Sequence, residues 1–250
     1  MNQYQFYYYE EYWNEGLEGW SPSNIQMKPL ERALIKRYVR PNSRVLDYGC
    51  GDCSRYSDYV ESLGAEFIGV DISLAAVKKC KEKGKRALVQ DLSGQLPFRS
   101  DSFEVVLCFE VLEHIFRPDM ALQEIKRVLV PGGLIIVSVP NITWIGNRFL
   151  MLAGFFNPGG SPSTSLKAPW KDPHIRFFSK RSLLKLLSHE LKFRILEFVG
   201  TEFSIADLPL LYKINAIRRF LTIVSLPIKW LGHYWPSLFA SNLFVVAQKT

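Results

Sequence analysis

The stretch VLDYGCG, residues 45–51, decides the fold of this chain of 250 residues. A short apolar run that ends in Asp-x-Gly-x-Gly is typical of a buried strand that turns sharply, because glycine lacks the Cβ that would block the turn or an approaching ligand. A helix that follows such a turn presents backbone N–H groups without intrahelical partners. The stretch therefore predicts a strand, a ligand-binding turn and a helix.

Outward from this turn, short β-branched runs alternate with segments of helical periodicity. This alternation is typical of a doubly wound α/β fold, in which helices cover both faces of a mostly parallel sheet. Helix 118–130 begins at Pro118 and ends before Pro131, and helix 179–190 has Ser179 as its candidate N-cap. The strands are predicted at residues 43–49, 66–71, 86–91, 103–110, 134–140, 193–200 and 242–249.

Acidic residues end the first three predicted strands. Asp71 lies 24 residues after Asp47, where a carboxylate can accept both hydroxyls of a ribose, and Asp91 could accept a hydrogen bond from an adenine amino group. The carboxyl ends of parallel strands meet at one edge of the sheet, which is where open α/β folds bind ligands. A nicotinamide dinucleotide is disfavoured, because Ser54 replaces the last glycine of the G-x-G-x-x-G fingerprint.

These residues carry a family resemblance. The run VLDYGCG, with GVDIS, QDLSGQLPF, FEVVLCFEVLEHI and VLVPGGLIIVSVPN, resembles the class I S-adenosylmethionine-dependent methyltransferases, and within them the quinone-biosynthesis-like (type 11) group. The resemblance is strong over residues 40–141 and weaker through PHIRFFS and the last two strands. It implies a Rossmann-like methyltransferase fold with a seven-stranded sheet whose last strand is antiparallel, and S-adenosyl-L-methionine as the cofactor.

The resemblance also implies which residues contact the cofactor. The turn after the first strand would line its methionine portion, the second strand end its ribose and the third its adenine, and the fourth strand end would lie beside the sulfonium. The expected cofactor-binding residues, in that order, are Asp47, Gly49, Cys50 and Gly51, then Asp71 and Ile72, then Asp91 and Leu92, then Phe109 and Glu110. Cys53 stands where the family often has a third glycine, which would widen the turn.

The same turn contains a second motif, since Cys50 and Cys53 spell C-x-x-C. A zinc site needs four ligands, or three and water, and neither Cys80 nor Cys108 belongs to a second close pair. A redox pair fits the position after a strand, but it leaves Asp71 and its counterpart on the third strand unexplained. We interpret Cys50 as a small residue that fills the turn, and we expect no metal site.

The net charge of the chain is +7, and the excess of basic residues lies in two segments. Residues 140–182 carry +5 and residues 204–250 carry +4, whereas residues 1–20 carry −4. This charge is either an ordinary solvated surface or a surface that meets something anionic.

The overall composition, 48% apolar and 22% charged, is that of a globular protein. The first residues lack the features of a signal peptide, and no run approaches the roughly 18 apolar residues of a membrane span. Four cysteines in a chain of this length fit a reducing compartment. We therefore expect a cytoplasmic protein.

We predict a single domain over 1–250 with four parts. Residues 1–40 form an aromatic, helical cap that folds over the site, and residues 41–141 form the cofactor-binding core. Residues 142–178, which show no clear period, and residues 201–240 are substrate-side insertions. In 201–240 apolar residues at helical spacing predict an amphipathic region, which either packs on the protein's own core or contacts a membrane surface.

Two histidines are the candidate catalytic residues. Methyl transfer is an in-line displacement, so a base is needed only where the acceptor must lose a proton. His114 follows the fourth predicted strand, where the methyl group should point, and His174 in PHIRFFS would border the substrate pocket by resemblance. A purely structural role is the alternative for each. Glu110 and Glu113 could orient His114 or help to hold a divalent ion.

Three functions are compatible with these features. The leading one is methyl transfer to an oxygen of a small-molecule acceptor, with apolar, lipid-linked and glycan-related molecules as candidate acceptors. The second is a nucleic-acid methyltransferase, which the charge suggests, but FEVLEHI replaces the Asn/Asp-Pro-Pro-aromatic motif expected of base-flipping amino-methylating enzymes. The third is a non-catalytic cofactor-binding protein of the same fold. The sequence does not indicate the oligomeric state.

Overall fold

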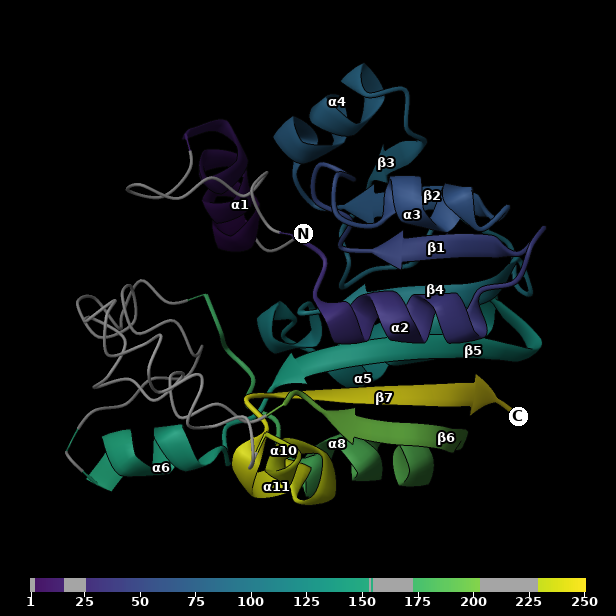
Figure 1. Cartoon of the computed structure of the whole chain (residues 1–250). Helices are drawn as coiled ribbons and strands as arrows, with labels where there is room; N and C mark the ends of the chain where they lie inside the picture. The colour runs from purple at the N-terminus through teal and green to yellow at the C-terminus, as the bar shows by residue number, and fades with distance from the viewer. Residues whose placement is uncertain (1–2, 16–25, 153, 155–172, 203–228) are drawn as a thin grey trace.

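A computed structural model describes residues 3–15, 26–152, 154, 173–202 and 229–250. The chain folds around a seven-stranded sheet with the strand order β3-β2-β1-β4-β5-β7-β6 (Figure 1). Only β7 runs antiparallel to its neighbours β5 and β6. The strands are β1 (Arg44–Tyr48), β2 (Glu66–Asp71), β3 (Ala87–Val89), β4 (Phe103–Phe109), β5 (Leu129–Pro140), β6 (Phe193–Gly200) and β7 (Asn242–Lys249). The predicted doubly wound, seven-stranded α/β fold is confirmed.

Strand bounds follow the sequence pattern closely: β1, β3 and β4 are shorter than predicted by one or two residues at an end, and β5 differs more. The predicted strands 66–71, 193–200 and 242–249 match β2, β6 and β7 residue for residue. In contrast, β5 begins at Leu129 and not at residue 134, because Leu129 already pairs with Phe103 of β4 before the Pro-Gly-Gly turn.

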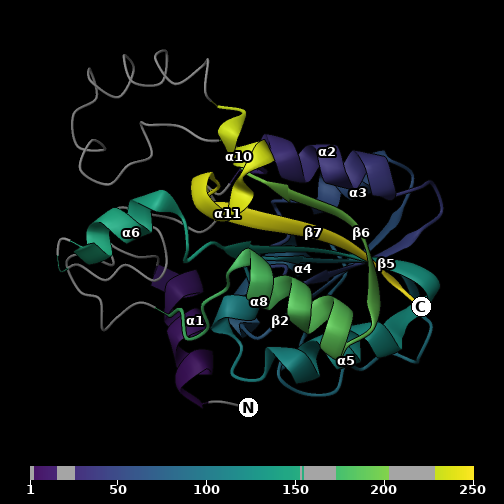
Figure 2. The same cartoon turned by 90° about the horizontal axis from the view of Figure 1, so that it is seen from below.

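The helices lie on both faces of the sheet, and each face has its own apolar core (Figure 2). One face packs against α2 (Pro29–Tyr38), α3 (Ser57–Ser62) and α4 (Leu74–Glu82), and the other against α5 (Pro118–Val128), α8 (Lys180–Leu184) and the π-helical turn η4 (Lys185–Glu190). In α5 the buried Leu122, Ile125 and Val128 recur every three residues, so they form the core face predicted for this helix. Ser179 accepts a hydrogen bond from the Ser182 backbone N–H, which confirms it as the N-cap of α8.

The carboxyl ends of the parallel strands point toward α1 (Gln3–Glu15) and α6 (Ile145–Leu152), and β7 points the opposite way (Figure 1). The helix α6 lies inside the segment 142–178, for which the sequence predicted no periodic structure. Its sequence IGNRFLML is apolar on more than one side, so no single face stands out in the pattern.

Part of the second insertion is described. The stretch 203–228, which holds most of the predicted amphipathic stripe, lies outside the described residues. After it come the short helices α10 (Leu231–Tyr234) and α11 (Pro236–Phe239). Among the described helices, none combines the length and apolar content that crossing a membrane requires.

Candidate functional site

The glycine turn after β1 requires glycine at two positions. Gly49 and Gly51 have φ angles of +87° and +53°, in the left-handed region that favours glycine. A Cβ at Gly49 would lie 2.5 Å from the Val111 side chain, and one at Gly51 would lie 2.4 Å from the ring of Trp13. The turn is therefore closed by neighbouring side chains and has no room for larger residues.

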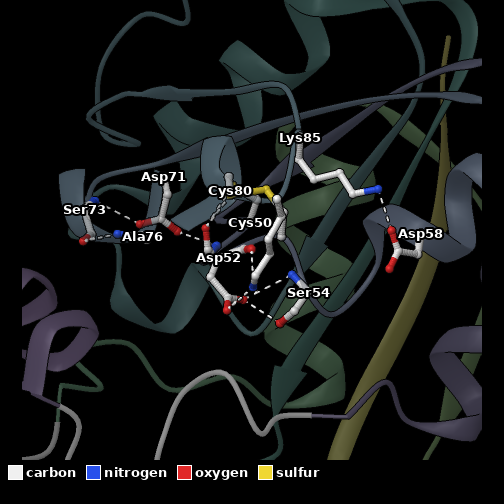
Figure 3. The surroundings of a disulfide bond; sticks show 12 residues. Cys50, Asp52, Ser54, Asp58, Asp71, Ser73, Ala76, Cys80 and Lys85 are labelled. Atoms are coloured by element: carbon white, nitrogen blue, oxygen red, sulfur yellow. Dashed lines mark hydrogen bonds and ion pairs between the residues drawn. A yellow bond between two sulfur atoms is a disulfide. The ribbon is translucent and has the colours of Figure 1, made fainter. Parts of the chain in front are cut away.

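The carboxylate of Asp71 holds this turn in place (Figure 3). It accepts hydrogen bonds from the backbone N–H groups of Gly51, at 2.8 Å, and Ser73, at 3.0 Å. Burial raises the pKa of Asp71, and these two hydrogen bonds oppose that rise. Each carboxylate oxygen can accept more than one hydrogen bond, so Asp71 keeps acceptor capacity for a ligand.

Asp47 lies at the carboxyl end of β1 and is almost completely buried. Its Oδ2 atom has no hydrogen-bond partner among the described residues. Burial raises its pKa to about 8, and the nearby Arg55 guanidinium opposes the rise. A buried oxygen without a partner among the described residues fits a hydrogen-bond donor of a polar ligand, such as the expected cofactor.

The other expected cofactor residues lie along the same edge. Asp91 is half-buried and its Oδ1 accepts the Ser93 N–H at 2.9 Å. The ring of Phe109 packs in the core, 5.1 Å from that of Tyr56, so this residue can face the edge only through its backbone. Three more of them are buried: Cys50, Ile72 and Leu92.

Glu110 binds neighbouring strands rather than a histidine. Its Oε1 accepts a hydrogen bond from the Ser138 hydroxyl at 2.6 Å, and its Oε2 accepts one from the Asn242 amide at 2.8 Å. The carboxylate thus ties the end of β4 to β5 and β7. Glu113, and not Glu110, is the acid beside the candidate catalytic histidines.

Glu113, His114 and His174 form one cluster. The Nε2 atoms of His114 and His174 each lie 3.9 Å from Glu113 Oε1, and the two imidazole rings stack with centroids 4.5 Å apart. The Glu113 side chain is buried, and neither of its carboxylate oxygens has a hydrogen-bond partner among the described residues. Burial, and then the negative charge of Glu110, raises the pKa of Glu113 well above its usual value.

Backbone contacts bring the second histidine to the first. The N–H groups of Ile175 and Arg176 both donate to the Glu113 carbonyl, at 2.9 and 3.0 Å. The Arg176 guanidinium also donates to the carbonyl of Phe116 and lies over its ring. These contacts hold the PHIRFFS segment against the 3₁₀ turn η2 (Leu112–His114). The structure therefore joins the two histidines that the sequence singled out separately.

The helix α1 lies beside both parts of the site. The ring of Tyr9 contacts that of His114, with centroids 5.8 Å apart in an edge-to-face arrangement. Glu10 accepts the first N–H groups of α4, and the carbonyl of Trp13 accepts a hydrogen bond from Lys79. The helix α1 thus contacts His114 and α4, and the aromatic cap over residues 1–40 stays a prediction.

The cysteines are arranged differently from the prediction. Cys80 is not isolated: it forms a disulfide with Cys53, and the Cys80 side chain lies beside Cys50 in Figure 3. Sequence reasoning missed this pair because it considered only the spacing of Cys50 and Cys53. A usable signal was topological, since a cysteine in the β1 turn and one in the helix after the adjacent strand β2 can meet.

Two clusters in the described part of the chain have donor atoms close enough for a metal ion. The first, Cys50 with the disulfide pair, offers only one free thiol while the disulfide is intact. The second is the Glu113, His114 and His174 cluster, whose carboxylate and imidazole atoms lie within 4.8 Å of one another. Its nitrogen and oxygen ligands suit a divalent cation. The expectation of no metal stays a prediction.

Comparisons with known proteins agree with this geometry. Residues 46–137 match the family described as a methyltransferase domain. The ubiquinone biosynthesis O-methyltransferase of Xanthomonas campestris is 32% identical over 119 residues, which are 44% of this chain and 48% of that protein. The tRNA (carboxymethyluridine(34)-5-O)-methyltransferase of Arabidopsis thaliana is 36% identical over 100 residues, 39% of this chain and 24% of that protein. The chain thus spans less than half of the length of these two relatives.

A solved structure matches over almost the whole chain. A SAM-dependent methyltransferase from Archaeoglobus fulgidus superposes with a TM-score of 0.60 at 20% identity, over 98% of this chain and 100% of that one. At this identity the likeness concerns the fold alone.

Proposed function

We infer that this chain is a class I S-adenosylmethionine-dependent methyltransferase that transfers a methyl group to an oxygen atom of a small-molecule acceptor. The family match over the glycine turn and the fold carry the first part. The observation that supports the second part is the cluster of one buried carboxylate and two partly buried imidazoles that follows β4. A hydroxyl acceptor must lose a proton as it is methylated, and this cluster can take that proton.

The residues that hold the cofactor follow from the edge geometry. We assign the ribose to Asp71, the methionine portion to the turn from Asp47 to Gly51, and the adenine to Asp91. When bound, S-adenosylmethionine supplies an electrophilic methyl group. Trp13 covers the turn from the side of α1, so this helix restricts access of water to the bound group.

Proton transfer is the work of the histidines. His114 Nδ1 lies 3.3 Å from the carbonyl of Pro173, which fixes the ring when Nδ1 carries the hydrogen and leaves Nε2 facing Glu113. An imidazole that takes the acceptor's proton becomes a cation beside the Glu113 carboxylate. That carboxylate is costly to charge in isolation, and an adjacent imidazolium offsets the cost. We propose His114 and His174 as catalytic residues and Glu113 as the residue that positions and stabilises them.

Calorimetry of cofactor binding tests the premise. S-Adenosylmethionine and S-adenosylhomocysteine should bind the wild type, and Asp71→Asn should weaken binding at least tenfold, about 1.4 kcal/mol. Asp58→Asn is the matched control, because the Asp58 side chain is exposed. Asp91→Asn serves as a second variant should loss of the Asp71 hydrogen bonds impair folding. A wild type that binds neither compound would refute the inference.

A nucleic-acid acceptor is the second candidate. The match to a tRNA methyltransferase and the basic segments favour it. It predicts RNA binding that weakens steeply with added salt. Filter binding with tRNA at low and high salt decides the matter, and undetectable binding at low salt would eliminate it. Cofactor binding without turnover of any acceptor would instead support a non-catalytic protein.

The segments that contact the acceptor, and the surface at which the protein acts, are also proposals. We keep 142–178 and 201–240 as the substrate-side insertions and propose that residues 229–240 contact a membrane surface from the cytoplasmic side. Trp230, Tyr234 and Trp235 are exposed there, the residue types found at membrane interfaces. Disulfides are rare in reducing compartments, so the measured redox state of the Cys53–Cys80 pair tests the cytoplasmic part of this proposal.

A further inference from the structure

A pocket lies outside the cluster and the glycine turn, and residues in or next to α6, α8 and α11 line it. Figure 2 shows where these three helices lie. The volume of the pocket is about 380 Å³. Hydrogen bonds fix two of its walls relative to each other, since the Thr143 hydroxyl lies 2.8 Å from the Ser237 carbonyl. Three basic and three hydroxyl residues line it together with the apolar Leu184: Arg148, Lys180, Arg181, Thr143, Ser179 and Ser237.

The positive charge of this pocket is not neutralised. Among the described residues no carboxylate forms an ion pair with Arg148, Lys180 or Arg181. Arg148 uses its Nε to donate to the Thr143 carbonyl, which orients the guanidinium, and its terminal N–H groups have no acceptor in the part of the chain that the structure describes. Lys180 lies over the ring of Phe198. Three cations that form no ion pair with any described residue are complementary, around one pocket, to an anion with several oxygen atoms.

Apolar side chains adjoin the pocket in the sequence. On α6, Phe149 directly follows Arg148, and Leu152 is 86% exposed. On the other side, Trp235 lies two residues before Ser237 and is 57% exposed, with Trp230 and Tyr234 in ring contact nearby. A cationic pocket beside an exposed aromatic surface suits a molecule with an anionic head and an apolar body.

We propose that this pocket binds the phosphate or diphosphate group of an amphiphilic acceptor, and that the exposed surface of α6 and α10 takes its apolar portion. The pocket lies near the same edge of the sheet as the cofactor turn, because Asn141, at the end of β5, donates to the carbonyls of Pro236 and Ala240 beside it. That the bound molecule is the methyl acceptor rests on the proposed function. The affinity of the pocket for a phosphoryl group does not.

Binding measurements with two charge-reversal variants test the proposal. Arg181→Glu removes one pocket cation, and Lys185→Glu makes the same charge change on the next turn, at a side chain that is 69% exposed and outside the pocket. The probes are inorganic diphosphate by calorimetry, and flotation with vesicles of phosphatidylcholine alone or with phosphatidic acid. A single-stranded RNA oligonucleotide is the third probe, and S-adenosylmethionine is titrated in parallel.

The proposal predicts binding to diphosphate or to phosphatidic acid vesicles that Arg181→Glu weakens at least tenfold relative to Lys185→Glu. Binding of diphosphate without binding to vesicles indicates a soluble phosphorylated acceptor. Binding to the phosphatidic acid vesicles indicates a lipid headgroup. Equal effects of the two variants, no binding to either probe, or RNA binding of equal or higher affinity would overturn it. S-Adenosylmethionine binding is measured separately. If the protein binds S-adenosylmethionine but no phosphoryl probe, the pocket proposal fails and the proposed function stands. If it binds a phosphoryl probe but not S-adenosylmethionine, the proposed function fails and the pocket proposal stands.

Discussion

Glu113 Oε1 lies 3.9 Å from His174 Nε2. The two residues are distant in the chain, because Glu113 follows β4 and His174 precedes α8, with β5 and α6 between them. The backbone of the next two residues, Ile175 and Arg176, is hydrogen-bonded to the Glu113 carbonyl, so the contact is built into the main chain. This relationship places both imidazoles beside one buried carboxylate.

Replacing Glu113 by Gln should lower kcat about 100-fold while leaving cofactor affinity unchanged, because general acid–base contributions are typically of that size or larger. The acid limb of the pH–kcat profile should move to lower pH, since an imidazolium would no longer have a carboxylate beside it. Release of S-adenosylhomocysteine with a panel of hydroxyl acceptors measures both. Glu190→Gln, an exposed change, is the control. An unaltered profile with reduced kcat would indicate a merely structural glutamate.

The buried Asp47 predicts that stability falls as pH rises. Its folded-state pKa of about 8 lies above the unfolded value of 3.8, so the folded protein holds the proton more tightly. This contribution is complete at low pH and is lost between about pH 4 and pH 8, at roughly 1.4 kcal/mol per pH unit. Urea unfolding at three pH values should show a shallower decline in Asp47→Asn than in the wild type. Asp119→Asn should keep the wild-type slope of unfolding free energy against pH, because Arg117 lowers the pKa of Asp119. Identical slopes in all three proteins would contradict the prediction.

Alanine at Gly51 should cost more stability than alanine at Gly84. Both glycines have positive φ angles, so both substitutions carry a backbone cost of roughly 1 kcal/mol. A Cβ at Gly84 meets nothing within 4 Å, whereas one at Gly51 collides with the ring of Trp13. Thermal unfolding of the two variants measures the difference. In a Trp13→Ala background the extra cost at Gly51 should disappear, and its persistence would mean that another contact is responsible.

Reduction of the Cys53–Cys80 disulfide should destabilise the protein. The bond closes a loop with a sequence separation of 27, which corresponds to about 3–4 kcal/mol in the chain-entropy description. Thiol titration of the denatured chain should find two free thiols before reduction by a dithiol, Cys50 and Cys108, and all four afterwards. Cys53→Ser with Cys80→Ser should lose the response to the dithiol, while Cys108→Ser should keep it. Four free thiols in the unreduced protein would exclude the disulfide.

Much of the fold could be predicted because it depends on short-range patterns. The bounds of β2, β6 and β7 follow from β-branched runs, and the core face of α5 follows from residues that recur every three or four positions. The helix α6 was missed because its sequence shows no such pattern. Phe149 and Leu152 are exposed, so the apolar residues of α6 do not define one buried face.

By itself, the sequence determined the glycine turn, the strands around it and the acids at the strand ends, because glycine stereochemistry and side-chain period act on neighbouring residues. Only the tertiary structure decided that His174 joins Glu113, that Cys80 bonds to Cys53, and that Arg148 and Arg181 line one pocket. Each of these pairs joins segments that are distant in the chain. Local periodicity shows which side of an element is buried, but the order of the strands in the sheet decides which distant segments meet.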